Sequence, residues 1–211
     1  MIYRKEKKKE IKLISLIKEI KDFIKESPVV INRTVGDRYD DPVANKEIRQ
    51  DFINLGGKKV GQFRFHNNVY DIYGKEEDNK IFFALLDEEY IMLSFDVEPV
   101  KIKNLNGVSS LSVVQSRIGD RSVWQEIAKT FVFDYLLKNY DFILSDQTHT
   151  PLGKLFWKGM ISKKLNELYC YAVDFNASQF LRLTNLNQFE TYYTPEYAKV
   201  RFIISNKEIT A

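Results

Sequence analysis

Residues 109–164 constrain the fold more than any other stretch of this chain. In order, they predict a strand (109–114), a turn containing Gly119, a helix (122–138), a short strand (142–145) and a second helix (151–163). The short strand, FILS, is almost entirely apolar, which is typical of a central strand covered on both faces. The segments before and after this unit are therefore expected to build onto its ends.

Helix-start signals support both predicted helices. Ser122 and Gln125 form a capping-box pattern, and Asp120 places negative charge where a helix N-terminus favours it. Thr150 and Pro151 are a typical cap and first residue for the second helix. The first helix carries apolar residues at spacings that place them towards a core, namely Val123, Ile127, Phe131, Leu136 and Leu137.

The N-terminal part, residues 1–57, is predicted to be helical. Isoleucines recur at three- and four-residue spacing through residues 5–26, which indicates an amphipathic helix. Ser27-Pro28 ends that helix, because a residue before proline is pushed out of the helical region. Asp41-Pro42 begins a second helix, and Gly56-Gly57 ends it.

From Lys58 onwards the periodicity changes to that of strands. Apolar and polar residues alternate in VGQFRF, and a second strand, NVYDIYG, follows an Asn-Asn turn. The next two strands, KIFFALL and YIMLSFDV, flank the turn at 87–89. Two later strands, LYCYAVDF and KVRFIIS, are joined by a polar connection at 176–197. The early strands have no helices between them, so they are expected to form an antiparallel meander. The predicted fold is of the α/β (α+β) class: a mixed, mostly antiparallel central sheet flanked by helices. We expect one domain, residues 1–211, with its sheet core at 58–205.

Composition bears on three properties: nucleic-acid binding, the redox compartment and membrane association. With 32 basic and 29 acidic residues the net charge is +3, which does not require a nucleic-acid partner and leaves one open. The single Cys170 excludes an intramolecular disulfide framework and fits a reducing compartment. No apolar run approaches the roughly 18 residues of a membrane span, and the N-terminus lacks the apolar region of a signal peptide. We expect a soluble, cytoplasmic protein without a membrane partner.

Several chemistries find no support in the residue pattern. The two histidines and one cysteine have no zinc-ligand spacing, and neither a nucleophile elbow nor a phosphate-binding Walker loop is present. Aromatic residues at 63–73 interleave with basic ones, which fits either a half-buried sheet or a stacking platform for single-stranded nucleic acid. The basic head, Arg4–Lys9, is either a solvated helix start or a contact for phosphate or an acidic surface.

The order of elements and the residues at 109–164 resemble the GNAT superfamily of acetyl-CoA-dependent N-acetyltransferases, in a divergent form. The segment SDQTHTPLGKLFWKGM is also similar to a corner of GNAT-like proteins from bacteriophages. The resemblance covers about residues 58–205. It implies an acyltransferase that moves an acetyl group from acetyl-CoA to an amine on a protein, nucleotide or small molecule, in the host cytoplasm if a phage encodes it.

The resemblance also implies a place for the cofactor, at the turn before helix 122–138. Backbone N–H groups at a helix N-terminus behind a glycine turn bind a pyrophosphate. The family pattern, Arg/Gln-x-x-Gly-x-Gly/Ala, is matched in part: Arg121 replaces the second small residue, and Asp120 stands where phosphate is expected. An ordinary structural turn is the alternative. The implied acetyl-CoA-binding residues are Val113, Val114, Gln115, Arg117, Gly119, Arg121 and Ser122.

Acyl transfer to an amine needs a proton acceptor and a proton donor. Asp146 and His149 are the candidate proton carriers, and a hydrogen-bonded turn is the alternative role of each. Helix 151–163 lacks the tyrosine that the family often places there. Tyr169 and Tyr171, in the next strand, are the candidates for a phenol near the site, with a role in strand packing as the alternative. Two hypotheses follow: an acetyltransferase, or a catalytically degenerate GNAT-like phage protein that binds a host protein or nucleic acid.

Overall fold

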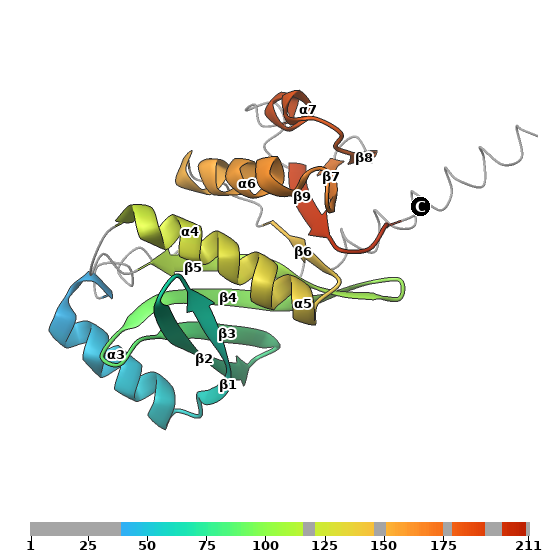
Figure 1. Ribbon diagram of the computed structural model, residues 1–211. Helices are drawn as coiled ribbons and strands as arrows, with labels where there is room; N and C mark the ends of the chain where they lie inside the picture. The colour runs from blue at the N-terminus through green and yellow to red at the C-terminus, as the bar shows by residue number, and fades with distance from the viewer. Residues whose placement is uncertain (1–38, 116–120, 146–150, 175–178, 193–199, 210–211) are drawn as a thin grey trace, which may run out of the picture. The chain divides into compact units, whose positions relative to one another are not determined.

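The computed structural model describes residues 39–115, 121–145, 151–174, 179–192 and 200–209; for 110–115, 121–125 and 151–152 it describes the backbone alone. Within these ranges, nine strands form one open sheet in the order β1-β2-β3-β4-β5-β6-β9-β7-β8 (Figure 1). The strands are β1 (Lys58–Phe65), β2 (Asn68–Glu77), β3 (Lys80–Leu86), β4 (Ile91–Ile102), β5 (Leu105–Gln115), β6 (Phe142–Leu144), β7 (Tyr169–Asp174), β8 (Gln179–Arg182) and β9 (Val200–Ser205). The expectation of a mixed α+β fold with a mostly antiparallel sheet is confirmed.

The chain divides into two compact units. Of the described residues, Val100–Ser109 and those from Asn139 onwards form the first unit, and those up to Pro99 together with Ser110–Lys138 form the second. Strands β4 and β5 contribute residues to both units. The expectation that the chain folds as one domain stays a prediction.

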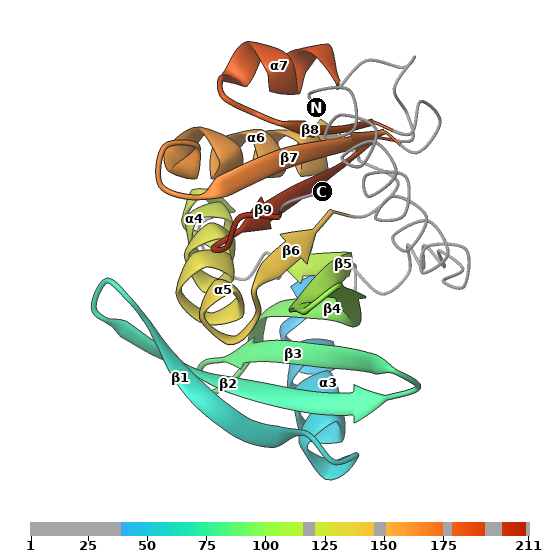
Figure 2. The same cartoon turned by 90° about the vertical axis from the view of Figure 1, so that its right-hand side faces the viewer.

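In the second unit, helices cover both faces of the β1–β4 meander (Figure 2). One is α3 (Pro42–Asn54), and the other runs from α4 (Arg121–Phe131) through a π-helical turn (Val132–Leu136) into α5 (Leu137–Asn139). Side chains alternate along a strand, so neighbours in β3 reach opposite faces. Ala84 and Leu86 belong to a cluster with residues of α3, whereas Phe83 contacts Phe131 of α4.

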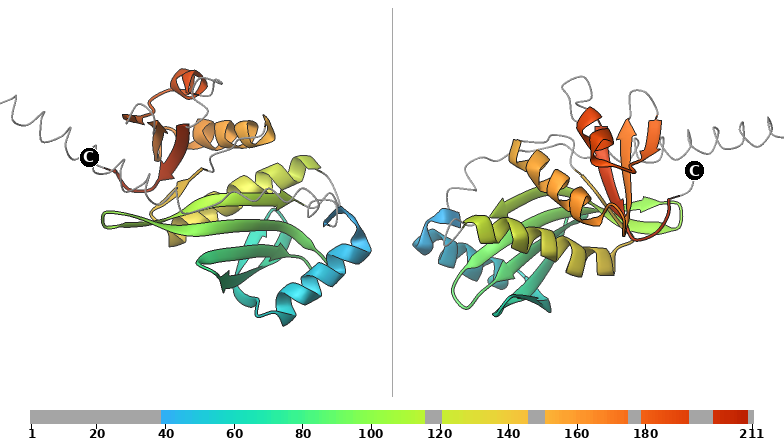
Figure 3. Two further views of the ribbon diagram at one scale, coloured as in Figure 1. Left: turned by 180° about the vertical axis from the view of Figure 1, so that it is seen from behind. Right: turned by 45° about the horizontal axis from the view of Figure 1, so that its top comes forward.

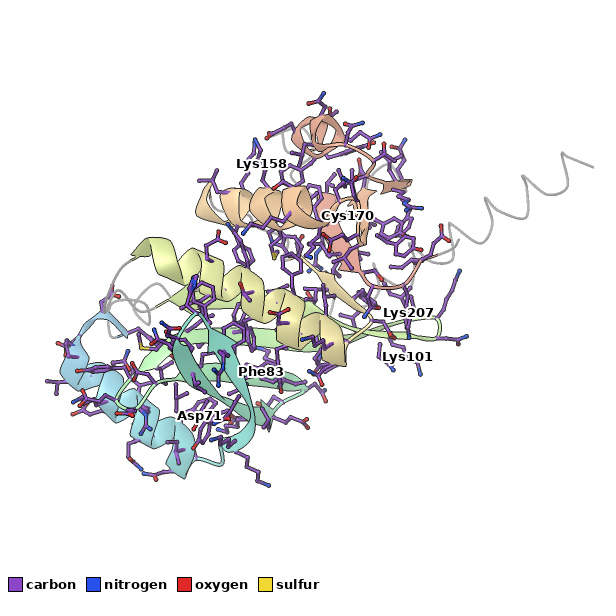
Figure 4. The ribbon with its side chains drawn as sticks, viewed as in Figure 1. Asp71, Phe83, Lys101, Lys158, Cys170 and Lys207 are labelled. Atoms are coloured by element: carbon purple, nitrogen blue, oxygen red, sulfur yellow. The ribbon has the colours of Figure 1, made fainter. Side chains whose placement is uncertain are left out.

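Phe131 is the centre of the core on the α4 face. Its ring centroid lies 5.1 Å from that of Phe95, 6.1 Å from that of Phe63 and 6.2 Å from that of Phe83 (Phe83 is labelled in Figure 4). Tyr135, one π-helical turn later, stacks on Phe131 at 5.2 Å. Three strands of the meander are therefore joined to the helix through a single aromatic side chain.

Asn45 joins the other face of the meander to α3. Its side chain is fully buried and makes three hydrogen bonds. Oδ1 accepts the N–H of Ile91 at 2.7 Å, and Nδ2 donates to the carbonyl oxygens of Ile91 at 2.9 Å and Tyr39 at 2.8 Å. The amide thus pairs with both backbone polar groups of the first residue of β4, as a neighbouring strand would.

The first unit contains β6 to β9, the adjoining ends of β4 and β5, α6 (Pro151–Lys164) and α7 (Leu186–Thr191) (Figures 1 and 3). Phe189 of α7 packs on Phe202 of β9, with ring centroids 4.5 Å apart. Lys154 and Lys158 of α6 form ion pairs with Glu190 of α7. Along β9, residues next to Phe202 point to the opposite face, where the buried cluster comprises Val100, Ile102, Phe142, Leu144, Tyr171, Val173, Ile203 and Ile209.

The structure corrects three expectations about local elements. The turn before β2 is at residues 66–67, because Phe65 pairs directly with Asn68; His66 has a φ of 52°. The helix predicted at 122–138 begins at Arg121 and contains the π-helical turn, for which the sequence shows no signal. The connection at 176–197 is not without structure, because it holds β8 and α7. The helix predicted at 5–26 lies outside the described residues.

Candidate functional site

The predicted cofactor-binding residues fall where the resemblance requires a strand to lead into a helix. Val113, Val114 and Gln115 end β5, and Arg121 and Ser122 open α4. Arg117 and Gly119, between these elements, lie outside the described residues, as do Asp146 and His149, between β6 and α6. The strand–helix–strand–helix order is confirmed, and the set of side chains proposed for the site stays a prediction.

The two strands that lead to these positions, β5 and β6, are parallel neighbours. Their described ladder pairs Gly107 with Phe142, Val108 with Ile143 and Ser109 with Leu144. The ladder needs glycine at its start: a Cβ on Gly107 would lie 2.4 Å from atoms of the Phe142 ring, which is closer than such atoms approach in proteins. Beyond Ser109, β5 continues for six residues to Gln115, whereas β6 ends at Leu144.

Ser145 ends β6 by an exchange of hydrogen-bond partners. Its N–H donates to the carbonyl of Phe202 at 2.8 Å, which continues the antiparallel ladder to β9. The returning N–H of Phe202 donates to the Ser145 hydroxyl at 2.9 Å. In a regular ladder the Ser145 carbonyl accepts that bond. Here the carbonyl instead accepts from Nε of Arg201, so the backbone leaves the ladder at this residue.

Arg201 joins β5, at Ser109, to the end of β6. Its side chain is only 3% exposed. While Nε donates to the Ser145 carbonyl, Nη2 donates to the Ser109 hydroxyl at 2.8 Å. Burying a cation costs free energy unless hydrogen bonds compensate, and the planar guanidinium supplies diverging donors that reach two strands at once.

Sequence reasoning missed Arg201, Ser109 and Ser145 as parts of the site. The one available signal is that Arg201 shares its side of the strand KVRFIIS with the apolar Ile203. A basic residue on an inward-facing side is unusual and generally has a specific partner.

Tyr169, the proposed phenol, lies away from Ser145 at the end of β6. It pairs with Ser205 of β9, which also pairs with Phe142 at the start of β6. Ser145 is three residues further along, or about 10 Å at the usual rise of a strand. The Tyr169 ring instead packs under the guanidinium of Arg182, 4.7 Å from its centroid, and against the buried cluster of the first unit.

The neighbouring side chains of β7 are also engaged in packing. Burial raises the pKa of the Tyr171 phenol, and its oxygen accepts the N–H of Ile209 at 3.0 Å. Burial raises the pKa of the Cys170 thiol to about 12, so it is almost entirely protonated at neutral pH (Cys170 is labelled in Figure 4). A nucleophilic cysteine needs a thiolate, the form that this burial disfavours.

The described part of the chain offers no metal centre, because no three or more of its His, Cys, Asp and Glu side chains gather closely enough to bind an ion. None of the helices in the same ranges combines the length and apolarity needed to cross a membrane.

Comparison with protein-family models, curated proteins and solved structures finds no match to this chain.

Proposed function

We propose that this protein is an acetyl-CoA-dependent acyltransferase with an amine acceptor. The observation that carries the proposal is the β5–α4–β6–α6 order with β5 and β6 as parallel neighbours whose described ladder has only three pairs. Among the strands of a mostly antiparallel sheet, one parallel pair with its two following helices is a specific arrangement. It is the arrangement that the GNAT superfamily uses to hold acetyl-CoA.

The proposed cofactor position follows from the backbone. An extended strand binds the amide groups of a ligand through its own N–H and carbonyl groups, so β5 beyond Ser109 is the proposed partner of the pantetheine arm. The N-terminus of α4 is the proposed partner of the pyrophosphate, because its first N–H groups have no partner within the helix and carry the positive end of the dipole.

The proposed reaction is direct transfer. The amine nitrogen attacks the thioester carbonyl carbon, the carbon–sulfur bond breaks, and coenzyme A leaves as a thiolate that takes up a proton. A base removes a proton from the amine, and either Asp146 or His149 is proposed for this role. The position of Tyr169 gives no support for its proposed role as acid.

A second candidate, binding without turnover, is favoured by that same position of Tyr169. The two candidates are separated by release of free thiol from acetyl-CoA in the presence of amines: a lysine-containing peptide, a polyamine and an amino sugar. An acyltransferase releases thiol with at least one of them, at a rate that falls at least tenfold in Gly119→Glu and in at least one of Asp146→Asn and His149→Ala. If acetyl-CoA binds but thiol release equals that of Gly119→Glu with every amine, the enzyme proposal is rejected in favour of the binding protein.

A further inference from the structure

Arg201 occupies a position that the element order alone does not explain. The family resemblance requires β5 and β6 to lie side by side, but it does not require a buried cation that joins them. The guanidinium spans from Ser145 to Ser109, 56 and 92 residues away in the chain. All three side chains belong to the first unit and are almost fully buried.

The Ser145 hydroxyl and Arg201 together fix the residue at which β6 stops. The hydroxyl accepts the N–H of Phe202 in place of the Ser145 carbonyl, and the guanidinium binds the carbonyl that is thereby released. Both groups are needed for this arrangement. Removal of the Ser145 hydroxyl takes away the acceptor of this hydrogen bond from the Phe202 N–H, and removal of the guanidinium takes away the donor of the bond to the buried Ser145 carbonyl. The end of β6 is therefore set at Ser145.

The same guanidinium holds β5 at Ser109, the last described residue in the ladder with β6. β5 and the end of β6 therefore share one rigid donor group. A lysine cannot reproduce this arrangement, because its single ammonium has no planar fork that reaches two acceptors in fixed directions.

We propose that Arg201 is a positioning residue for the acyl-donor site: by binding the Ser109 hydroxyl and the Ser145 carbonyl, it fixes β5 at Ser109 and the end of β6, beside which the pantetheine arm lies. This inference rests on the proposed function. It assigns to Arg201 no contact with the reacting atoms, and it applies to the pantetheine arm and not to the nucleotide of the cofactor, which is proposed to bind at the N-terminus of α4.

The test compares Ser109→Ala with Ser205→Ala in the full-length chain. Ser205 is a matched control, because it is also a buried serine of the first unit with several hydrogen bonds, but it lies at the opposite end of the ladder to β6. The ligands, titrated calorimetrically, are acetyl-CoA and 3′-phosphoadenosine 5′-diphosphate, the nucleotide fragment that lacks the pantetheine arm. Arg201→Lys is titrated in parallel where thermal unfolding shows that it folds.

Ser109→Ala is expected to weaken acetyl-CoA binding at least about tenfold, the effect of one buried hydrogen bond to a charged donor, and to leave nucleotide binding unchanged. Ser205→Ala is expected to bind both ligands as the wild type does. Equal losses in both serine variants, or equal losses for both ligands, would show a merely structural role and overturn the inference. So would wild-type affinity for acetyl-CoA in Ser109→Ala. If the wild type itself binds neither ligand, the proposed function fails and the positioning role fails with it.

Discussion

Replacing Gly107 with alanine tests the parallel ladder on which the site is built. Gly107 pairs with Phe142 at the start of β6, and the Phe142 side chain is fully buried. An alanine Cβ would lie 2.4 Å from Cε2 and Cζ and 2.5 Å from Cδ2 of that ring. Since three ring atoms are too close at once, the ring has to move as a whole.

The expected cost follows from what surrounds that ring. Phe142 belongs to the buried cluster that includes Tyr171 and Ile203, so it has no free space to enter. Overpacking of this kind typically costs about 1–3 kcal/mol, and the repulsion outweighs the roughly 0.5–1 kcal/mol that alanine gains over glycine within a strand. We expect Gly107→Ala to destabilise the chain by about 1–2 kcal/mol.

Urea denaturation followed by circular dichroism provides the assay, with a double-mutant cycle to identify the cause. In a Phe142→Leu background the shorter side chain relieves the clash, so the cost of Gly107→Ala is expected to fall by at least about 1 kcal/mol, a coupling typical of residues in contact. Gly61→Ala is the control, because its Cβ would meet nothing closer than 3.5 Å. An equal cost in both backgrounds, or a cost no larger than that of Gly61→Ala, would refute the register.

Two further predictions concern other parts of the fold. Asn45→Asp is expected to lower the free energy of unfolding in urea by about 3–5 kcal/mol, because a buried carboxylate cannot donate to the carbonyls of Tyr39 and Ile91. A loss below about 1 kcal/mol would contradict the role of the Asn45 amide in holding β4. The Lys207 ammonium, and then the Asn106 N–H, lower the pKa of Asp141 below its ordinary value of 3.8 (Lys207 is labelled in Figure 4). The stabilisation by Asp141 is therefore full above pH 3.8 and lost as pH falls through the lowered pKa. The stability difference between wild type and Asp141→Asn, measured by denaturation at a series of pH values, should be constant above pH 5 and shrink below about pH 4; a difference that grows in acid would contradict the assignment.

Local signals were sufficient for most of the regular elements. Asp41-Pro42 was expected to begin a helix, and the Asp41 carboxylate accepts the N–H groups of Val43 and Ala44 at 2.8 and 3.0 Å. The strand predicted at 80–86 has those bounds in the structure. In both cases the information lies within a few residues, in a cap or in an apolar run between turns.

Helix α7 was missed although a local signal for it exists. Asn185 caps the helix by accepting the N–H of Gln188 at 3.1 Å, and the Gln188 side chain accepts the N–H of Thr184 at 2.7 Å. This resembles a capping box formed by Asn and Gln, except that Gln188 accepts the N–H of the residue before the N-cap. Its polar residues made the segment resemble an irregular connection, and only Phe189 reaches the core.

The hydrogen bonds of Arg201 to Ser109 and Ser145 have no comparable local signal in the sequence. The partners of Arg201 lie on two other strands and far along the chain, and a hydrogen bond to a backbone carbonyl leaves no trace in the sequence of the residue that supplies it. The position of Tyr169 likewise depends on the register between β7 and β9. Candidate residues can be named from their order in the chain, but their distances depend on strand register, which the pattern of residues does not specify here.

Calorimetric titration of the full-length protein with acetyl-CoA tests the central claim most directly. The account predicts saturable binding with one site per chain and a dissociation constant in the micromolar range, together with weaker binding in Gly119→Glu, whose carboxylate would oppose the pyrophosphate at the start of α4. Absence of binding at millimolar acetyl-CoA, or binding that Gly119→Glu leaves unchanged, would contradict the claim that this sheet holds the cofactor.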